Sequence, residues 1–198
     1  MDLDGVPTTP RLTTILGSLT CRRFTPCELV PVAMVGADLQ LSDFKKSANF
    51  TTLRSVNGLF SARSSNPTRI FSVSAPLLRT IGSSLDVSAS RMTFNLVMPK
   101  LTSVRALDLH LWGTEASLEL TSLSTIGAGG VTLQQVSRTN MARVMSILLN
   151  TTSIGGSVRV LRPHSSWPLC QTIKDHVDRV SPANANHKFE AAVVIATC

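Results

Sequence analysis

The 198-residue chain carries a net charge of +7, and its sequence pI is about 9.9 although charged residues make up only 16% of it. It has no Tyr, two Trp and seven Phe, so its core has to be built mainly from aliphatic side chains. This length fits one domain, or one domain with an arm, without stabilising cross-links. The sequence lacks an apolar run long enough to span a bilayer, and the acidic leader "MDLDGVPTTP" excludes a typical secretory signal.

Residues 1–27 are expected to form an N-terminal arm. Thr9 precedes Pro10, an arrangement that favours a helix start. Apolar residues then recur at helical spacing, at Leu12, Ile15, Leu16 and Leu19. The pattern predicts a short amphipathic helix that packs either on its own domain or on a neighbouring subunit.

Residues 28–198 are expected to form a single β-rich domain. "RMTFNLVM" alternates apolar and polar residues, as a half-buried strand does. The turn-forming "SSNP" separates two predicted strands, Leu59 to Arg63 and Arg69 to Ser74. In "VRALDLHLWGTEASLEL" the "GTEA" turn predicts a hairpin, whose core residues are Leu107, Leu109, Leu111, Leu118 and Leu120.

The C-terminal third contains the clearest helical pattern, "RTNMARVMSILLN", with Thr139 or Asn140 as the N-cap. Its apolar stripe consists of Met141, Val144, Met145 and Leu148. Residues 170–180 repeat the helical spacing, and "KFEAAVVIAT" predicts a buried C-terminal strand. No internal repeat is apparent.

Together these elements predict a mainly β fold. The expected architecture is an antiparallel β-sandwich, jelly-roll-like, with two or three short helices in its connections. The alternative is an α+β domain with helices on one face of an antiparallel sheet.

The acidic residues and histidine of "VRALDLHLWGTEASLEL" are the only candidates for a catalytic cluster. Asp108 and His110 share one strand face, and Glu119 would lie across the predicted hairpin. Strand alternation explains this placement without catalysis, and a cross-strand charge pair contributes about 0.2–1 kcal/mol. We therefore expect no enzyme activity, although an enzyme using Asp108, His110 and Glu119 is kept as an alternative.

Metal and cofactor sites are not expected. The four cysteines, Cys21, Cys27, Cys170 and Cys198, lack zinc-ligand spacing, and free thiols are the favoured interpretation. "GAGG" and "SIGGS" lack the residues of a phosphate-binding loop, which favours turn glycines.

Positive charge is concentrated between Phe44 and Arg105, a segment that contains nine basic residues and a single acidic residue, Asp86. This distribution indicates either a solvated face or phosphate contacts with nucleic acid, RNA above all. The predicted contact residues are Arg11, Arg22, Arg23, Lys45, Lys46, Arg54, Arg63 and Arg69.

The favoured function is a self-assembling structural protein that packages nucleic acid, such as the capsid protein of a small RNA virus. Such a protein would have itself and RNA as partners, would not bind membranes, and would be found in the virion or the host cytoplasm. A non-assembling nucleic-acid-binding accessory protein is the second alternative.

Overall fold

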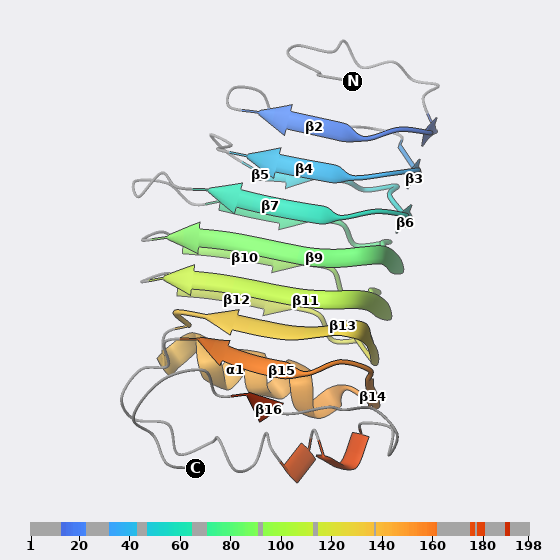
Figure 1. The fold of residues 1–198 in the computed structure, drawn as a ribbon. Helices are drawn as coiled ribbons and strands as arrows, with labels where there is room; N and C mark the ends of the chain where they lie inside the picture. The colour runs from blue at the N-terminus through green and yellow to red at the C-terminus, as the bar shows by residue number, and fades with distance from the viewer. Residues whose placement is uncertain are drawn as a thin grey trace.

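The computed structural model describes residues 13–22, 32–42, 47–64, 71–90, 93–112, 115–136, 138–161, 175–176, 178–180 and 189–190. The described chain winds into a β-solenoid of about 5 turns, with successive coils stacked on one another (Figure 1). All strand pairings among the described residues are parallel. The predicted antiparallel sandwich is therefore wrong, and so is the antiparallel α+β alternative.

The solenoid has two sheets that enclose the core between them. The large sheet contains 12 strands, and most coils add to it a short strand, a bend and a longer strand. Its strands are β1 (Thr14–Ile15), β2 (Leu19–Arg22), β3 (Met34–Val35), β4 (Leu39–Ser42), β6 (Ser55–Val56), β7 (Phe60–Ser64), β9 (Thr80–Ser90), β11 (Ser103–Trp112), β13 (Thr125–Gln134), β14 (Ser153–Ile154), β15 (Val158–Leu161) and β16 (Phe189–Glu190). The small sheet contains β5 (Ser47–Asn49), β8 (Phe71–Ser74), β10 (Thr93–Val97) and β12 (Glu115–Glu119).

Equivalent residues of successive coils lie directly above one another because the strands pair in register. One buried column before the bend consists of Ile15, Val35, Val56, Ile81, Val104, Ile126 and Ile154. A second column after the bend consists of Leu19, Leu39, Phe60, Leu85, Leu107, Val131 and Val158. The chain therefore does contain an internal repeat, of roughly 20–28 residues, contrary to the prediction.

The corner between the small and large sheets is the most regular part of each coil. A backbone hydrogen bond closes the same turn in five coils, joining the amide of Leu53, Leu78, Leu101, Leu123 or Thr151 to the carbonyl three residues earlier. Beyond this turn, hydroxyl groups bond the coils to one another. Thr102 donates to the Arg79 carbonyl (3.0 Å), and Ser124 donates in turn to the Thr102 carbonyl (3.3 Å).

The bend of the large sheet requires glycine where two coils approach closely. Gly130 has a positive φ of 71°, and a Cβ atom there would lie 2.1 Å from the Ser157 carbonyl oxygen. A Cβ atom on Gly156 would lie 2.4 Å from the Gly130 nitrogen. These glycines belong to the two glycine-rich stretches of the sequence, and their role is conformational.

Helix α1 (Arg138–Asn150) confirms the predicted helix and covers the edge of the small sheet. Its predicted stripe, Met141, Val144, Met145 and Leu148, is buried. Asn140 is not an N-cap, since its Oδ1 accepts a hydrogen bond from the Ala116 amide of β12 (3.0 Å). Arg143 donates to the carbonyl of the same Ala116, so the helix satisfies both backbone groups that a further strand would have bonded.

The predicted hairpin is wrong because its two strands belong to different sheets. β11 pairs with β9 and β13 in the large sheet, whereas β12 pairs with β10 in the small sheet. The alternation that places Leu107, Leu109 and Leu111 in the core is confirmed. Strict alternation would place Arg105 on the same face, but Arg105 is exposed because the register shifts between Val104 and Ala106. The strands predicted on either side of "SSNP" are likewise in different sheets, as β7 and β8.

The predicted N-terminal helix is also wrong where the structure describes the chain. Residues 14–15 and 19–22 form β1 and β2, which pair with β3 and β4. Cys21 is buried and disulfide-bonded, against the expectation of free thiols, whereas Cys27, Cys170 and Cys198 lie outside the described residues. The boundary between residues 27 and 28 also lies outside them and stays a prediction.

The C-terminal elements are described only in part. Residues 175–176 and 178–180 are helical, within the predicted helix. His176 is buried there, its Nδ1 accepts a hydrogen bond from Arg179 (2.8 Å), and its Nε2 donates to the Thr151 carbonyl (3.2 Å). Of the predicted C-terminal strand, Phe189–Glu190 forms β16, paired with β15, and residues 191–198 lie outside the described chain.

Candidate ligand-binding groove

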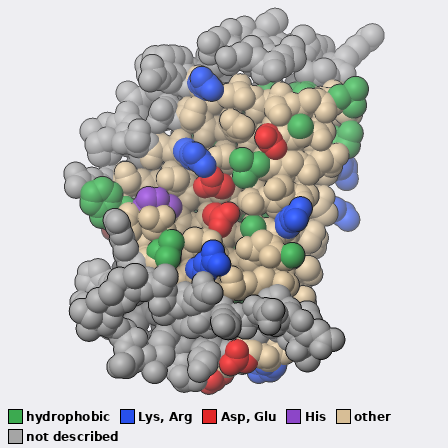
Figure 2. All heavy atoms as spheres, in the orientation of Figure 1, with side chains coloured by type: hydrophobic (Ala, Val, Ile, Leu, Met, Phe, Trp, Pro, Cys, Tyr) green, Lys and Arg blue, Asp and Glu red, His purple; other side chains and the backbone are tan. Residues whose placement is uncertain are grey.

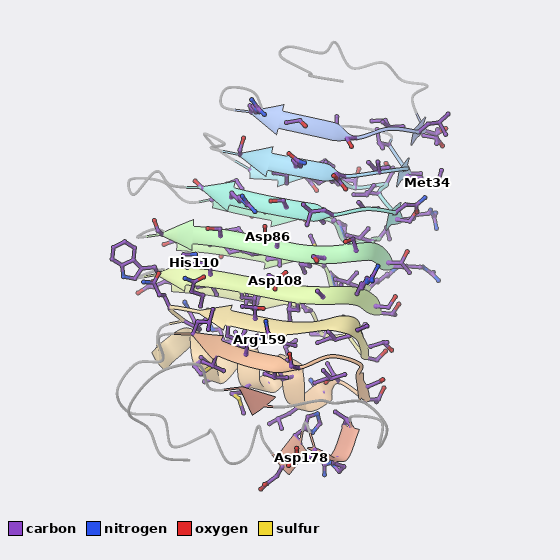
Figure 3. The ribbon with its side chains drawn as sticks, in the orientation of Figure 1. Met34, Asp86, Asp108, His110, Arg159 and Asp178 are labelled. Atoms are coloured by element: carbon purple, nitrogen blue, oxygen red, sulfur yellow. The ribbon has the colours of Figure 1, made fainter. Side chains whose placement is uncertain are left out.

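The outer face of the large sheet carries rows of polar side chains that run across the coils. Strand alternation turns Leu107 and Leu109 into the core and therefore turns Asp108 and His110 outward. Asp108 pairs in register with Asp86 on one side and with Thr132 on the other. Figure 3 shows Asp86, Asp108 and Arg159 along this face, with His110 beside Asp108.

These rows line two adjoining depressions, which we call together the polar groove. The first has a volume of about 400 Å³ and is lined by Arg63, Asp86, Ser88, Asp108, Leu109, His110, Thr132 and Gln134. The second has a volume of about 370 Å³ and is lined by Ser42, Arg63, Ser64, Ser88, Ala89, Ser90, His110 and Trp112. Arg63, Ser88 and His110 line both, so the groove is one continuous surface across β4, β7, β9, β11 and β13.

Arg63 and Asp86 form an ion pair on the floor of the groove. The Nη2 and Nε atoms of Arg63 lie 2.5 Å and 3.2 Å from Asp86 Oδ2, so Arg63 does not use Oδ1. The Arg63 side chain is 63% exposed, and such surface pairs contribute only about 0–1 kcal/mol to stability. The pair therefore serves mainly to hold the two side chains in place and to match their charges.

Asp108 differs from its neighbour Asp86 in its electrostatic environment. Burial raises the pKa of Asp108 above its ordinary value, and the adjacent Asp86 carboxylate raises it further. A hydrogen bond with the Thr132 side chain opposes both effects. The groove thus holds one carboxylate that is paired with Arg63 and a second carboxyl group that binds a proton more readily than an exposed aspartate.

His110 is oriented by a residue at the end of the next strand. Its Nε2 lies 2.6 Å from Gln135 Oε1, so Nε2 carries the proton of this hydrogen bond. Gln135 has a φ of 53°, a left-handed conformation that costs a non-glycine residue about 1 kcal/mol or more. The strained backbone lies beside the groove and places the amide where it fixes the imidazole ring.

Trp112 lies at the end of the groove, in register with Ser90. Its residue surface is 48% exposed, and the other exposed large hydrophobic residues of the described chain are Leu16 and Leu149. Neither leucine lines the groove, so Trp112 is the exposed large hydrophobic residue among its described lining residues, and it gives the groove an aromatic surface.

The structure brings together only part of the predicted catalytic cluster. Asp108 and His110 are neighbours in the groove, but Glu119 lies on β12 of the small sheet and is exposed. Asp86, Thr132 and Gln134 complete the groove. Thr132 and Gln134 did not stand out in the sequence, and Asp86 did so only as the single acid of the basic segment. The spacing of one coil between Asp86 and Asp108 would have indicated their contact if the repeat had been recognised.

The predicted nucleic-acid contacts are scattered where they are described. Arg22 and Arg63 occupy the same row on either side of Ser42, and Arg54 is exposed at the corner before β6. Arg11, Arg23, Lys45, Lys46 and Arg69 lie outside the described residues. Figure 2 shows acidic side chains at the centre of the large-sheet face and basic ones around them, rather than a uniformly basic surface.

Neither the described residues nor similarity to known proteins assigns this groove to a known class of site. Within the described ranges, His, Cys, Asp and Glu side chains form no group of three or more that could hold a metal ion. None of the helices in the described chain is long and apolar enough to cross a membrane. No protein-family model, curated protein or solved structure matches the chain.

Proposed function

We propose that the protein is a ligand-binding protein whose polar groove holds an elongated ligand across several coils. The observation that carries this proposal is that two depressions share Arg63, Ser88 and His110 and so form one surface over five strands. Stacked coils of a solenoid present extended binding surfaces of this kind. Because the groove side chains project from paired strands, little conformational entropy is lost when they bind a ligand.

The groove offers hydrogen-bonding groups of both kinds at close spacing. Arg63 donates, the Asp86 and Asp108 carboxylates accept, and Gln134 and the serine hydroxyls can do both. Adjacent strands are about 4.8 Å apart, so these groups recur along the stacking direction with the coils. A ligand with regularly spaced polar groups would meet a new set of partners at each coil.

A binding screen with paired groove and control variants tests this proposal. Thermal-shift and calorimetric titrations would use neutral oligosaccharides, acidic oligosaccharides, single-stranded RNA, and acidic and basic peptides. We expect at least one class to bind, with an affinity about tenfold or more lower in the Asp86→Asn/Asp108→Asn variant, which corresponds to about 1.4 kcal/mol. The matched Glu115→Gln/Glu119→Gln variant removes two exposed carboxylates from the small sheet and should bind normally.

The proposal is wrong if none of these classes binds, or if the two double variants weaken binding equally. Circular dichroism of each variant would show that the fold is retained.

A second candidate function, nucleic-acid binding, is favoured by a pair of arginines at the corner of the solenoid. The Arg79 amide donates to the Arg54 carbonyl (2.8 Å), so these two exposed residues occupy equivalent positions on adjacent coils. Two guanidinium groups at this spacing suit phosphate contacts. Arg63 adds little to them because Asp86 already matches its charge.

On this second proposal the protein binds RNA, either as a self-assembling capsid protein of a small RNA virus or as a non-assembling accessory protein. Location in the virion or the host cytoplasm is part of the same proposal. Arg54→Gln/Arg79→Gln should weaken RNA binding. It should also reduce the slope of log affinity against log salt concentration by an amount that corresponds to about two phosphate contacts. Electron microscopy distinguishes the capsid from the accessory role, and unchanged RNA affinity in the double variant would contradict both.

A further inference from the structure

We infer that the ligand of the polar groove is a neutral carbohydrate chain, with one sugar ring stacked on Trp112 and others hydrogen-bonded along the rows of β9, β11 and β13. This inference rests on the proposed binding function and adds the chemical class of the ligand. The charge, the hydrogen-bonding groups, the aromatic surface and the small number of apolar side chains in the groove each restrict that class.

The charges of the groove disfavour an anionic ligand. Two carboxyl groups, Asp86 and Asp108, lie on its floor, and Arg63 is already paired with the first. A phosphate or uronate group placed there would meet at least one carboxylate, and the guanidinium beside it is already paired with Asp86. A cationic ligand gains little from the groove either, because Arg63 matches the charge of Asp86 and burial raises the pKa of Asp108 above its ordinary value. Uncharged polar ligands need no charge match.

The hydrogen-bonding groups match vicinal hydroxyls. A carboxylate accepts from two hydroxyl groups, and a guanidinium donates to two oxygens, whereas each sugar hydroxyl both donates and accepts. Asp86 Oδ1 is not used by Arg63 and is available on that side of the ion pair. Ser88 and Gln134 flank His110 in the same row and add groups that can bond in either direction.

Trp112 supplies the surface on which the apolar face of a sugar ring can pack. A tryptophan residue that is 48% exposed at the end of a polar groove offers apolar surface beside a set of hydrogen-bonding groups. The same depression is lined otherwise by serines, an alanine, Arg63 and His110. Among the described residues that line it, Trp112 and Ala89 are the apolar ones, fewer than the apolar side chains that form the pockets for lipids or for the side-chain anchors of peptides.

Calorimetric titration with neutral hexasaccharides tests the inference directly. The probes are glucan, mannan, xylan and galactan hexasaccharides, compared with a galacturonate hexasaccharide and an RNA hexanucleotide. We expect at least one neutral probe to bind, and Trp112→Ala to lower its affinity about tenfold or more while Trp112→Phe retains most of it. Leu149→Ala is the matched control, since Leu149 is an exposed apolar residue outside the groove.

Salt dependence gives an independent readout. Affinity for a neutral sugar should change less than about twofold between 50 and 500 mM salt, whereas RNA binding would fall steeply. If only the galacturonate or RNA binds, and groove variants weaken it, the inference is overturned while the proposed binding function stands. If none of these probes binds, the inference is overturned, and the proposed binding function fails as well unless a peptide of the wider screen binds the groove. Full affinity of Trp112→Ala for a neutral sugar would also overturn the inference.

Discussion

Replacing Gly130 by Ala would test how closely the coils of the solenoid are packed at the bend. An alanine at a φ of 71° costs about 1–2 kcal/mol relative to glycine. Its Cβ would also lie 2.1 Å from the Ser157 carbonyl oxygen, a backbone atom of the next coil that can only move with that coil. Relief of such overpacking costs about 1–3 kcal/mol. Gly130→Ala should therefore lower the free energy of unfolding by about 2–5 kcal/mol.

Gly17→Ala provides the matched control in the first coil. A Cβ atom there would meet nothing within 4 Å, and Gly17 has no positive φ. Restricting the unfolded chain should leave this variant unchanged or up to about 1 kcal/mol more stable. Urea unfolding followed by circular dichroism measures both variants. Equal stability of the two, or a loss below about 1 kcal/mol for Gly130→Ala, would refute the reasoning.

Three further predictions concern the core, the helix and the groove. Phe94 is fully buried and its ring stacks on that of Phe71 (5.4 Å), so Phe94→Ala should cost about 3–5 kcal/mol in urea unfolding, and Phe94→Leu clearly less. Asn140→Ala leaves the buried Ala116 amide without its acceptor and should lower the free energy of unfolding by about 1–3 kcal/mol. Asn150 is exposed on the same helix, and Asn150→Ala should change this free energy by less than about 0.5 kcal/mol. Equal losses in the two variants would contradict the contribution of the Asn140 hydrogen bond. The pKa of Asp108 is higher in the folded protein than its ordinary value of 3.8, so the folded state binds this proton more tightly than the unfolded state does. The resulting contribution to the free energy of unfolding is complete below pH 3.8 and is lost as the pH rises through the raised pKa. Asp108→Asn should flatten this fall in urea midpoints measured between pH 3 and 7, and an unchanged pH profile would show that Asp108 is not the group responsible.

The elements that were predicted correctly are those that depend on neighbours in the sequence. The stripe of α1 and the alternation of β11 are set by periods of 3.6 and 2 residues, which burial of one face imposes on any helix or strand. Leu107 and Leu109 therefore face the core, and Asp108 and His110 the solvent, whichever sheet β11 joins.

Sheet topology could not be predicted in this way, because a strand alternates identically in parallel and antiparallel sheets. "GTEA" has the composition of a hairpin turn, yet the strands that flank it belong to opposite sheets. The repeat was obscured because its coils differ in length, so Ile15 and its equivalents do not recur at one fixed interval. Only the register of the folded chain shows that these residues form a column.

The sequence by itself determined the buried stripe of α1 and the buried residues of β10 and of β11 from Leu107 onward, since local periodicity and hydrophobicity suffice for that. Tertiary structure alone decided which polar residues meet. Asp86, Asp108 and Thr132 come from three different coils and become neighbours only because parallel strands stack in register. Glu119 is far closer to Asp108 in sequence than Asp86 is, yet it lies on β12 of the other sheet. The polar groove is therefore a product of coil stacking.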